Sequence, residues 1–256
     1  MKIIIFFKRS KRQNIFLITV ACIFLTLFLA ITVFRASAVF TENEKALPIY
    51  CVDTKEKKIA LTFDTNWGDD NIIKILDILD ENNVKATFFI LGIWVDKYPD
   101  MVKEIYKRGH EIGNHSNNHP DFTYISKDRA IQEIATTDAK LMKLIGVGTS
   151  IFRFPSGSYN EEAVKIVEST NHFCIQWDVD SIDWKEHGAD IEYNRVMKKT
   201  RPGSILLFHN GAKYTPETLP KIIKGLKSKG YEFVKVSDLI YKKDYYIDYS
   251  GKQISK

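Results

Sequence analysis

Short apolar runs and helical patterns alternate through most of this chain, and this alternation limits the folds that it can adopt. Buried-strand patterns occur at Ile49–Val52, Lys58–Phe63, Val84–Leu91, Ile151–Phe154, Phe173–Trp177, Ser204–Phe208 and Glu232–Val236. Between them, apolar residues recur at helical spacing in Asn71–Leu79, Pro99–Lys107, Ser126–Ile145, Glu161–Glu168, Ile191–Lys199 and Pro216–Lys227. The pattern predicts a parallel α/β domain, and its length suits a barrel better than an open sheet.

The amino-terminal segment differs in charge from the rest of the chain. Residues 1–35 carry six Lys or Arg side chains and no acid, whereas the other residues carry 31 basic and 32 acidic side chains. The α/β part is therefore close to neutral. Because nucleic-acid binding needs a clustered basic face, we expect no nucleic-acid partner.

An uncharged apolar run, Ile15 to Phe34, follows this basic cluster and is long enough to span a bilayer. We expect residues 1–14 to be a cytoplasmic basic segment and residues 15–34 to be a transmembrane helix or uncleaved signal anchor. The domain would then lie outside the cell membrane on a single-pass anchor. The alternative is a secreted protein that is cleaved near Ala38. Residues 35–56 are interpreted as a linker and first strand, and residues 241–256 as a C-terminal tail.

His115 and His119 form the first candidate site. Their spacing of four residues lets both imidazoles converge on one point in a helical turn or a tight loop. Neutral imidazole nitrogens in that arrangement bind divalent metals. The pair follows Ile112-Gly113, a predicted strand end, and barrel enzymes place their chemistry at such ends. The spacing predicts a metal site; the alternative is two surface histidines in an Asn-rich turn.

Two further predicted strands end in charged residues. Asp64 follows one strand and could act as a base, or it could cap the next helix. Arg153 lies in another and could pair with a carboxylate and keep it ionised. The alternative for this second segment is a plain turn built by Pro155 and Gly157.

A run of acids precedes the last candidate. Asp178, Asp180 and Asp183 lie within six residues, and one of them could orient a histidine. His209 directly follows the strand Ser204–Phe208, on the face where the other candidates are expected. A lone histidine is usually structural, but this position favours a role in the site.

These segments resemble, in order, the five motifs of polysaccharide deacetylases, the NodB-like enzymes of carbohydrate esterase family 4. The motifs are Thr62-Phe63-Asp64, His115-Ser116-Asn117-Asn118-His119, Arg153-Phe154-Pro155-Ser156-Gly157, Asp180-Ser181-Ile182-Asp183-Trp184 and Leu206-Leu207-Phe208-His209. The resemblance covers residues 57–240, the predicted deacetylase domain. The Trp-Gly pair after Asp64 and the basic anchor look most like the sporulation-associated PdaB-like branch.

The resemblance implies a fold and a set of roles. The fold would be a distorted (β/α)7 barrel preceded by the transmembrane helix. His115 and His119 would bind a divalent metal, usually zinc but also cobalt or another ion. Asp64 would be the base that activates water, and Arg153 would be its partner. Asp183 would orient His209, the acid that protonates the leaving amine.

The same resemblance implies the substrate contacts. The backbone N–H of the residue after the motif's proline would stabilise the oxyanion, as a preorganised donor should. Two further side chains would line the acetyl pocket. These substrate-binding residues would be Pro155, Ser156, Trp184 and Leu206.

The sequence departs from the family pattern next to the base. The family has a second aspartate there that completes the metal site, whereas this chain has Thr65. A threonine hydroxyl is a poor zinc ligand. Asp69 or Asp70 could take its place, or water could fill the position.

These features favour an exported, metal-dependent deacetylase that removes N-acetyl groups from peptidoglycan or a chitin-like glycan and that works as a monomer. We expect a role in spore or cell-wall modification. The alternative is a catalytically weak glycan-binding protein, which Thr65 motivates. A glycosidase that uses Asp64 and Asp183 ranks last, because it has no use for the two histidines.

Overall fold

The computed structural model describes residues 20–29, 46–66, 68 and 70–256. The chain divides into two units, residues 1–45 and 46–256. In the first unit, the described residues 20–29 form a helix. The rest of the expected membrane span, the cytoplasmic segment and the cleavage site near Ala38 lie outside the described residues. None of the described helices is both long enough and apolar enough to cross a membrane.

The second unit is built on one sheet of parallel strands in the order β6-β5-β4-β3-β2-β8-β7. A further strand, β9, pairs with the start of β2. The strands are β2 (Lys58–Thr65), β3 (Thr87–Ile90), β4 (Glu111–Asn114), β5 (Ile151–Phe152), β6 (Phe173–Cys174), β7 (Val179–Asp180), β8 (Ile205–His209) and β9 (Glu232–Val234). The predicted parallel α/β class is confirmed as a half-barrel, while the full seven-unit barrel stays a prediction.

The strands at the two edges of this sheet, β6 and β7, are close together in the sequence. β6 pairs with β5, and β7, a few residues later, pairs with β8 at the other end. The Ile175 N–H donates to the Phe152 carbonyl at 2.8 Å, and the Asp178 N–H donates to the Ile205 carbonyl at 3.2 Å. Residues 173–180 therefore link the first and last strands and curve the sheet.

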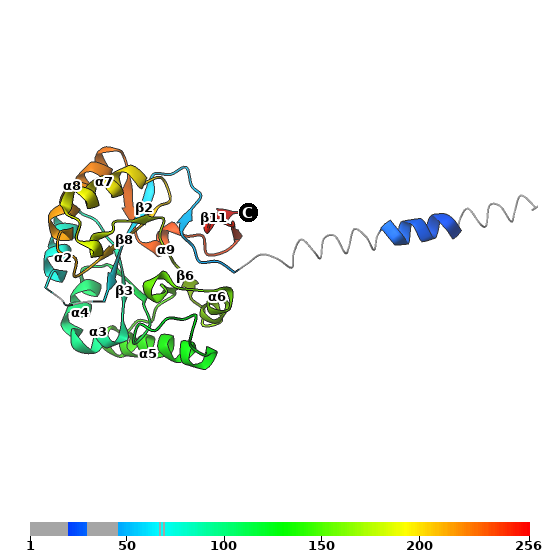
Figure 1. Cartoon of the computed structure of the whole chain (residues 1–256), viewed down its shortest axis with the longest axis horizontal. Coiled ribbons are helices and arrows are strands. Elements are labelled where there is room, and N and C mark those ends of the chain that lie inside the picture. Colours follow the sequence, from blue (N-terminus) through cyan, green and yellow to red (C-terminus); the bar gives the residue numbers. More distant parts are fainter. Residues whose placement is uncertain (1–19, 30–45, 67, 69) are drawn as a thin grey trace, which may run out of the picture. The chain divides into compact units, whose positions relative to one another are not determined.

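Helices surround the sheet (Figure 1). They are α2 (Ile72–Glu81), α3 (Gly92–Lys97), α4 (Pro99–Lys107), α5 (Lys127–Ile145), α6 (Glu161–Glu168), α7 (Ala189–Lys199), α8 (Thr215–Ser228) and α9 (Val236–Leu239), with 3-10 turns η1 (Pro155–Gly157) and η2 (Asp183–Lys185). Ser126 caps the start of α5, because its side chain accepts from the Arg129 N–H. The helix ends at Gly146, whose φ of 76° suits glycine.

Aromatic side chains of neighbouring strands fill the core. Phe63 on β2 stacks on Phe88 of β3 with 4.9 Å between ring centroids, and it contacts Phe208 of β8 at 5.9 Å. All three side chains are fully buried, and each such burial contributes about 1.5–3 kcal/mol. This packing fixes β2 between β3 and β8, so the residues that follow these strands are held at fixed positions.

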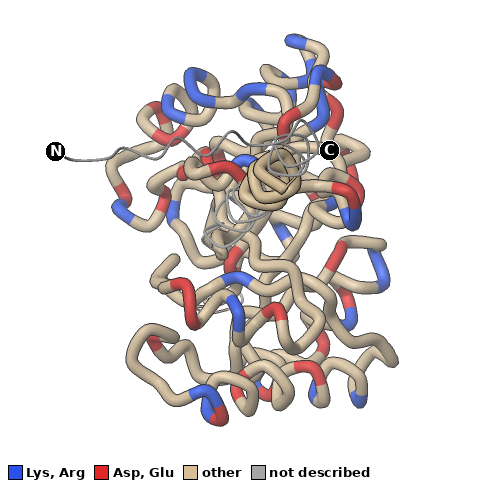
Figure 2. Tube along the Cα trace, turned by 90° about the vertical axis from the view of Figure 1, so that its right-hand side faces the viewer, with Lys and Arg blue, Asp and Glu red and all other residues tan. Residues whose placement is uncertain are grey.

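The segment expected to be a C-terminal tail is part of the fold. β10 (Tyr245–Ile247) and β11 (Lys252–Ser255) form a small sheet with β1 (Cys51–Val52), in the order β1-β11-β10. β11 pairs with β1 in parallel, with Cys51 opposite Lys252. Acidic and basic residues are interspersed along the backbone of residues 46–256 (Figure 2).

Candidate active site

The parallel strands bring the predicted residues to one edge of the sheet. Asp64 near the end of β2 lies opposite His209 at the end of β8. His115 directly follows β4, and Arg153 directly follows β5. A cavity of about 320 Å³ opens at this edge. It is lined by Asp64, Asn66, His119, Ser156, Trp177, Asp180, Trp184, Leu207 and His209.

Asp64 and Arg153 form a buried ion pair. Arg153 Nη1 donates to Asp64 Oδ1 at 2.8 Å and lies 2.8 Å from Thr62 Oγ1, while Nη2 donates to the Gln176 carbonyl at 3.1 Å. Burial alone would raise the pKa of Asp64, but the charges of Arg153 and the neighbouring histidines lower it below its usual value. Asp64 is therefore an ionised carboxylate at the cavity floor, as a base must be.

The two motif histidines are neutral; His119 lines the cavity, and His115 is fully buried beside Asp64. His115 Nδ1 lies 2.9 Å from the Arg153 carbonyl, which can only accept, so Nδ1 carries the proton and Nε2 a lone pair. Desolvation lowers the pKa of His115 to about 4 and also lowers that of His119. Within the described residues, neither buried Nε2 has a hydrogen-bond partner. The ring centroids are 5.1 Å apart, so this pair fits a divalent cation.

A carboxylate that the sequence analysis missed holds the histidine loop. Glu133 of α5 is 2% exposed, and its Oε2 accepts from the backbone N–H groups of Asn117 at 2.9 Å and Asn118 at 2.7 Å. The loop needs this support because Ser116 and His119 have positive φ angles of 70° and 60°. A glutamate on the inward face of a predicted amphipathic helix was the available signal.

The positions considered for a third metal ligand are Thr65, Asp69 and Asp70. Thr65 is fully buried, and its hydroxyl donates to the Phe89 carbonyl at 3.0 Å. Asp70 is exposed and does not line the cavity, and Asp69 lies outside the described residues. No group of three or more His, Cys, Asp or Glu residues suited to a metal occurs in the described part of the chain. Asp64 is the nearest carboxylate, with its Oδ2 3.6 Å from His115 Nε2.

His209 and Asp183 form the second charged pair. His209 Nδ1 lies 2.8 Å from Asp183 Oδ1, and the His209 backbone N–H donates to Oδ2 at 2.7 Å. Desolvation alone would lower the pKa of His209, but the hydrogen bond and charge of Asp183 raise it above its usual value. The protonated imidazole is thus favoured, with Nδ1 directed at Asp183 Oδ1.

The turn after β5 positions a backbone donor. Ser156 has a positive φ of 55° and lies exposed in the turn η1 behind the buried Pro155. No described residue accepts a hydrogen bond from the Ser156 N–H. The prediction that this group donates to substrate is consistent with its place at the cavity wall.

The apolar wall of the cavity differs from the prediction by one residue. Trp184 lines the cavity and is 49% exposed, as expected for a substrate contact. Leu206, however, lies in the hydrophobic core, and Leu207 lines the cavity. The assignment of Leu206 is wrong because successive side chains of β8 point to opposite faces. Two further cavity residues, Asn66 and Trp177, were missed by the sequence analysis, and Asp180, one of the three acids named there, also lines the cavity.

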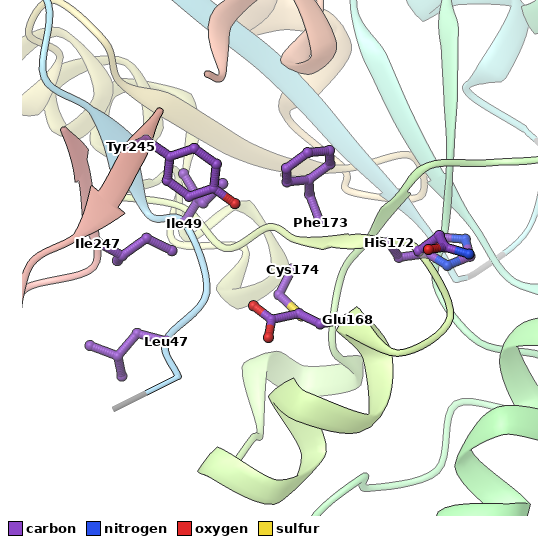
Figure 3. Close-up of a pocket in the computed structure, with 9 residues that line it drawn as sticks. Leu47, Ile49, Glu168, His172, Phe173, Cys174, Tyr245 and Ile247 are labelled. Carbon is purple, nitrogen blue, oxygen red and sulfur yellow. The ribbon is translucent and has the colours of Figure 1, made fainter. Parts of the chain in front are cut away.

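A second cavity, of about 510 Å³, lies at the start of β6, away from the chemistry (Figure 3). Its walls come from β6, α6, the segment before β1, and β10 (Figure 3). The histidine in it, His172, is already held: Nε2 lies 3.2 Å from Asp138 Oδ2, and Nδ1 lies 2.9 Å from the Thr170 carbonyl. Its acid and its histidine, Glu168 and His172, are not paired with each other among the described residues.

Comparison with known proteins agrees with this geometry. The polysaccharide deacetylase family model matches residues 52–174. The chain belongs to this family, the NodB-like enzymes of carbohydrate esterase family 4.

Two relatives and one solved structure are similar to this chain over most of its length. A peptidoglycan-N-acetylglucosamine deacetylase of Bacillus cereus is 38% identical over 208 residues, which cover 78% of this chain and 74% of the relative. The peptidoglycan-N-acetylmuramic acid deacetylase PdaA of Bacillus subtilis is 33% identical over 205 residues, covering 78% of each chain. A solved structure of a family 4 pseudoenzyme from Bacillus anthracis has a TM-score of 0.73 at 34% identity, covering 82% of this chain and 73% of that one.

Proposed function

We propose that this protein is a metal-dependent deacetylase that hydrolyses N-acetyl groups of peptidoglycan or a related N-acetylated glycan. The observation that carries the proposal is the pair of buried, unpartnered Nε2 atoms of His115 and His119. They lie at the edge of the sheet that also presents an ionised base, Asp64, and a histidine, His209, whose protonated form is favoured. Amide hydrolysis needs this combination, because one group must take a proton and another must give one.

Asp64, Ser156 and His209 each have a separate role in the proposed reaction. Asp64 accepts a proton from the attacking water as its oxygen bonds to the acetyl carbon. The Ser156 N–H donates to the oxyanion that forms. His209 then gives its proton to the nitrogen as the carbon–nitrogen bond breaks, so that acetate and a free amine leave. A divalent ion held by His115 and His119, zinc or another such as cobalt, supplies Lewis-acid activation of water and carbonyl.

The remaining metal ligand is part of the proposal. Asp69 or Asp70 supplies it, or water does, because the Thr65 hydroxyl is committed to a backbone carbonyl. Alanine variants at the two aspartates, singly and together, separate these cases. A ligand's loss should lower metal affinity by at least the roughly 10–100-fold seen when supporting groups are removed. Wild-type affinity in the double variant would leave two histidines and water.

The cellular setting is a further part of the proposal. We propose that residues 15–34 anchor the protein in the cell membrane, with residues 1–14 in the cytoplasm and a monomeric domain outside, acting on the cell wall or in sporulation. The apolar run behind a basic cluster supports the anchor, and the names of the relatives support the substrate. Membrane fractionation and external protease digestion of the full chain test it; a soluble form that starts near Val39 would show cleavage instead.

Acetate release tests the activity. The full chain is incubated with peptidoglycan and, separately, with chitooligosaccharide, with and without added zinc or cobalt. Metal-dependent acetate release without shortening of the glycan is the expected result. Shorter sugars would indicate a glycosidase, and no release under any metal condition would overturn the deacetylase.

A specific observation also favours a second candidate, a glycan-binding protein of weak activity. Thr65 replaces the family aspartate, and one structural relative, that from Bacillus anthracis, is described as a pseudoenzyme. Here the chain would bind peptidoglycan in a sedimentation assay but release no acetate. The Thr65→Asp variant, which restores the family carboxylate, would then gain activity.

A further inference from the structure

A buried carboxylate that the proposed reaction does not use lies behind the Asp183–His209 pair. Glu192 is on α7 and is 1% exposed. α7 packs against α8 (Figure 1). Among the described residues, only one side chain is hydrogen-bonded to Glu192, that of Thr218 on α8. No basic side chain of the described chain lies within ion-pair distance of it. A buried acid without a cation is costly when charged, so its protonation state calls for an explanation.

A line of hydroxyl groups connects Glu192 to the site. Thr215, at the start of α8, donates to Asp183 Oδ2 at 3.1 Å. One turn later, the Thr218 hydroxyl lies 2.8 Å from Glu192 Oε2. Asp183 itself accepts from the backbone and ring of His209 and from the Trp184 N–H. Glu192 is thus two hydroxyl-bearing residues away from the group that orients the proposed acid.

The hydrogen-bond count decides where the proton is. The Thr218 hydroxyl has a single proton and three acceptors in reach: Glu192 Oε2, the Tyr214 carbonyl at 3.1 Å and the Thr215 carbonyl at 3.3 Å. Glu192 Oε1 is buried and has no partner among the described residues. If Glu192 were ionised, that oxygen would carry negative charge without a hydrogen-bond donor. A protonated Glu192 donates to Thr218, which passes its own proton to a carbonyl, and every donor is satisfied.

The surrounding charges act in the same direction. Asp183 from η2 and Glu217 from α8 both face Glu192 and disfavour its ionisation. The nearest cation on its own helix, Arg195, is engaged elsewhere, since its Nε donates to the Asp180 carbonyl at 2.7 Å. Burial, opposed in part by the Thr218 hydrogen bond, raises the pKa of Glu192 to about 7.

We propose that Glu192 is a positioning residue that acts as a neutral carboxylic acid. It holds Thr218, and with it the start of α8, so that Thr215 keeps Asp183 aligned on His209. In its neutral form Glu192 adds no second negative charge next to Asp183. The inference rests on the proposed function for its catalytic meaning. Its structural content does not, because the alignment of His209 exists with or without turnover.

The charge of Glu192 has a second consequence. When Glu192 loses its proton at higher pH, a negative charge appears near Asp183 and favours the His209 imidazolium. The pKa of His209 in the wild type is therefore expected to be higher than in Glu192→Gln, which cannot ionise. Two variants remove the hydrogen bond instead: Glu192→Leu deletes the carboxyl group, and Thr218→Val deletes its partner.

Infrared difference spectroscopy on the full chain locates the proton. Below the pKa of about 7, the wild type should show a protonated-carboxyl band that Glu192→Gln lacks. The matched control is Glu217→Gln, an exposed acid on α8 that pairs with Lys221 and should keep the band. A wild-type spectrum at low pH that Glu192→Gln leaves unchanged would overturn the proposal.

Nuclear magnetic resonance of the His209 ring tests the positioning. The hydrogen-bonded Nδ1 proton should persist in Glu192→Gln, with a lowered pKa of His209, and should broaden or disappear in Glu192→Leu and Thr218→Val. In the acetate assay, kcat should fall about tenfold in the latter two with KM nearly unchanged, the lower end of what lost supporting hydrogen bonds cost. If both match the wild type in resonance and kcat, Glu192 does not position the site. If the wild type releases no acetate, the proposed function fails while both spectroscopic results still decide this inference.

Discussion

His115 and His119 are held in place by different means. His115 is fully buried and is oriented by a backbone carbonyl, whereas the backbone N–H of His119 is held by the Ser116 hydroxyl at 3.0 Å in a strained turn. The first ring is therefore fixed by its own hydrogen bond, and the second depends on the shape of its loop. Both have a buried Nε2 atom that needs a hydrogen-bond donor or a cation as its partner.

Changing both residues to alanine should abolish metal binding. The purified domain should hold about one divalent ion per chain, because two imidazoles with an open position form one site. The double variant should hold none, as measured by elemental analysis after dialysis. His187→Ala, which removes an exposed histidine, serves as the control. Equal metal content in the double variant and the wild type would contradict the site.

Asp64→Asn should separate catalysis from metal binding. The amide keeps the shape of the carboxylate but cannot take a proton, so turnover should fall by about 10²–10⁴, the usual contribution of a general base. Metal content should stay near that of the wild type, because the two histidines remain. Acetate release and elemental analysis on the same preparation check both points. A variant with normal turnover would remove Asp64 from the mechanism.

His209 should set the alkaline limb of the pH profile. Its pKa is raised in the folded protein, so the protonated acid persists to higher pH than a free imidazole would allow. His209→Ala should lower kcat by about 10²–10⁴ and lose that limb. Acetate release measured from pH 5 to pH 10, at intervals of about one pH unit, shows the limb. An unchanged limb in the variant would refute the assignment of both His209 and Asp183.

The same shift predicts a stability effect. Because the folded pKa of His209 lies above the unfolded value of about 6.5, its contribution to stability is complete below that value. The contribution is lost as pH rises through the folded pKa. Thermal unfolding should therefore show a gap between wild type and His209→Ala that narrows at alkaline pH.

At the level of elements, α5 supports the histidine loop from behind. In Glu133→Gln one carboxylate oxygen becomes an NH2 donor. The side chain therefore cannot accept both from the Asn117 and Asn118 N–H groups and from Asn118 Nδ2, and the loop should loosen. Metal affinity should then fall about 10–100-fold, as for other groups that orient ligands. A competition titration with a chelating dye measures the change. Glu162→Gln, an exposed acid on α6, is the control, and equal affinity in both variants would show that Glu133 has only a structural role.

The elements show where sequence patterns are informative. Most helices and long strands were predicted, because β2 and β8 are continuous apolar runs and α5 has its Ser126 cap. The predicted strand Phe173–Trp177 hid a break, since pairing changes from β5 to β8 within residues 173–180. Nothing local in the sequence encodes which neighbour a strand selects.

The same limit applies to the site. Asp64, His115, Arg153 and His209 each follow or end a strand, so their convergence could be predicted once the strands were known to be parallel. Leu206 was misassigned because pattern alone does not say which face of β8 meets the cavity. Glu133 and Glu192 escaped notice because burial of a charged residue depends on partners that are distant in sequence.

At the scale of the whole molecule, one glycine joins the small sheet to the half-barrel. Gly203 has a φ of 78°, and a Cβ placed there would lie 1.8 Å from the Val52 carbonyl oxygen of β1. Gly203→Ala should therefore destabilise the domain by more than about 2 kcal/mol, the upper end of the conformational cost alone. Denaturant unfolding measures the change. Gly148→Ala, where the nearest atom is 3.7 Å away on a flexible side chain, should cost far less, and equal stability of the two variants would contradict the close approach.

The pairing of Cys51 with Lys252 also bears on the order of events during synthesis. A ribosome, or a translocation channel, delivers β1 long before β11, so β1 waits without its parallel neighbour until nearly all of the described domain has emerged. Native contacts between such remote segments carry a high entropic cost and form late. The domain should therefore stay incompletely folded, and remain a substrate for chaperones and for threading through a narrow pore, until residue 252 is free.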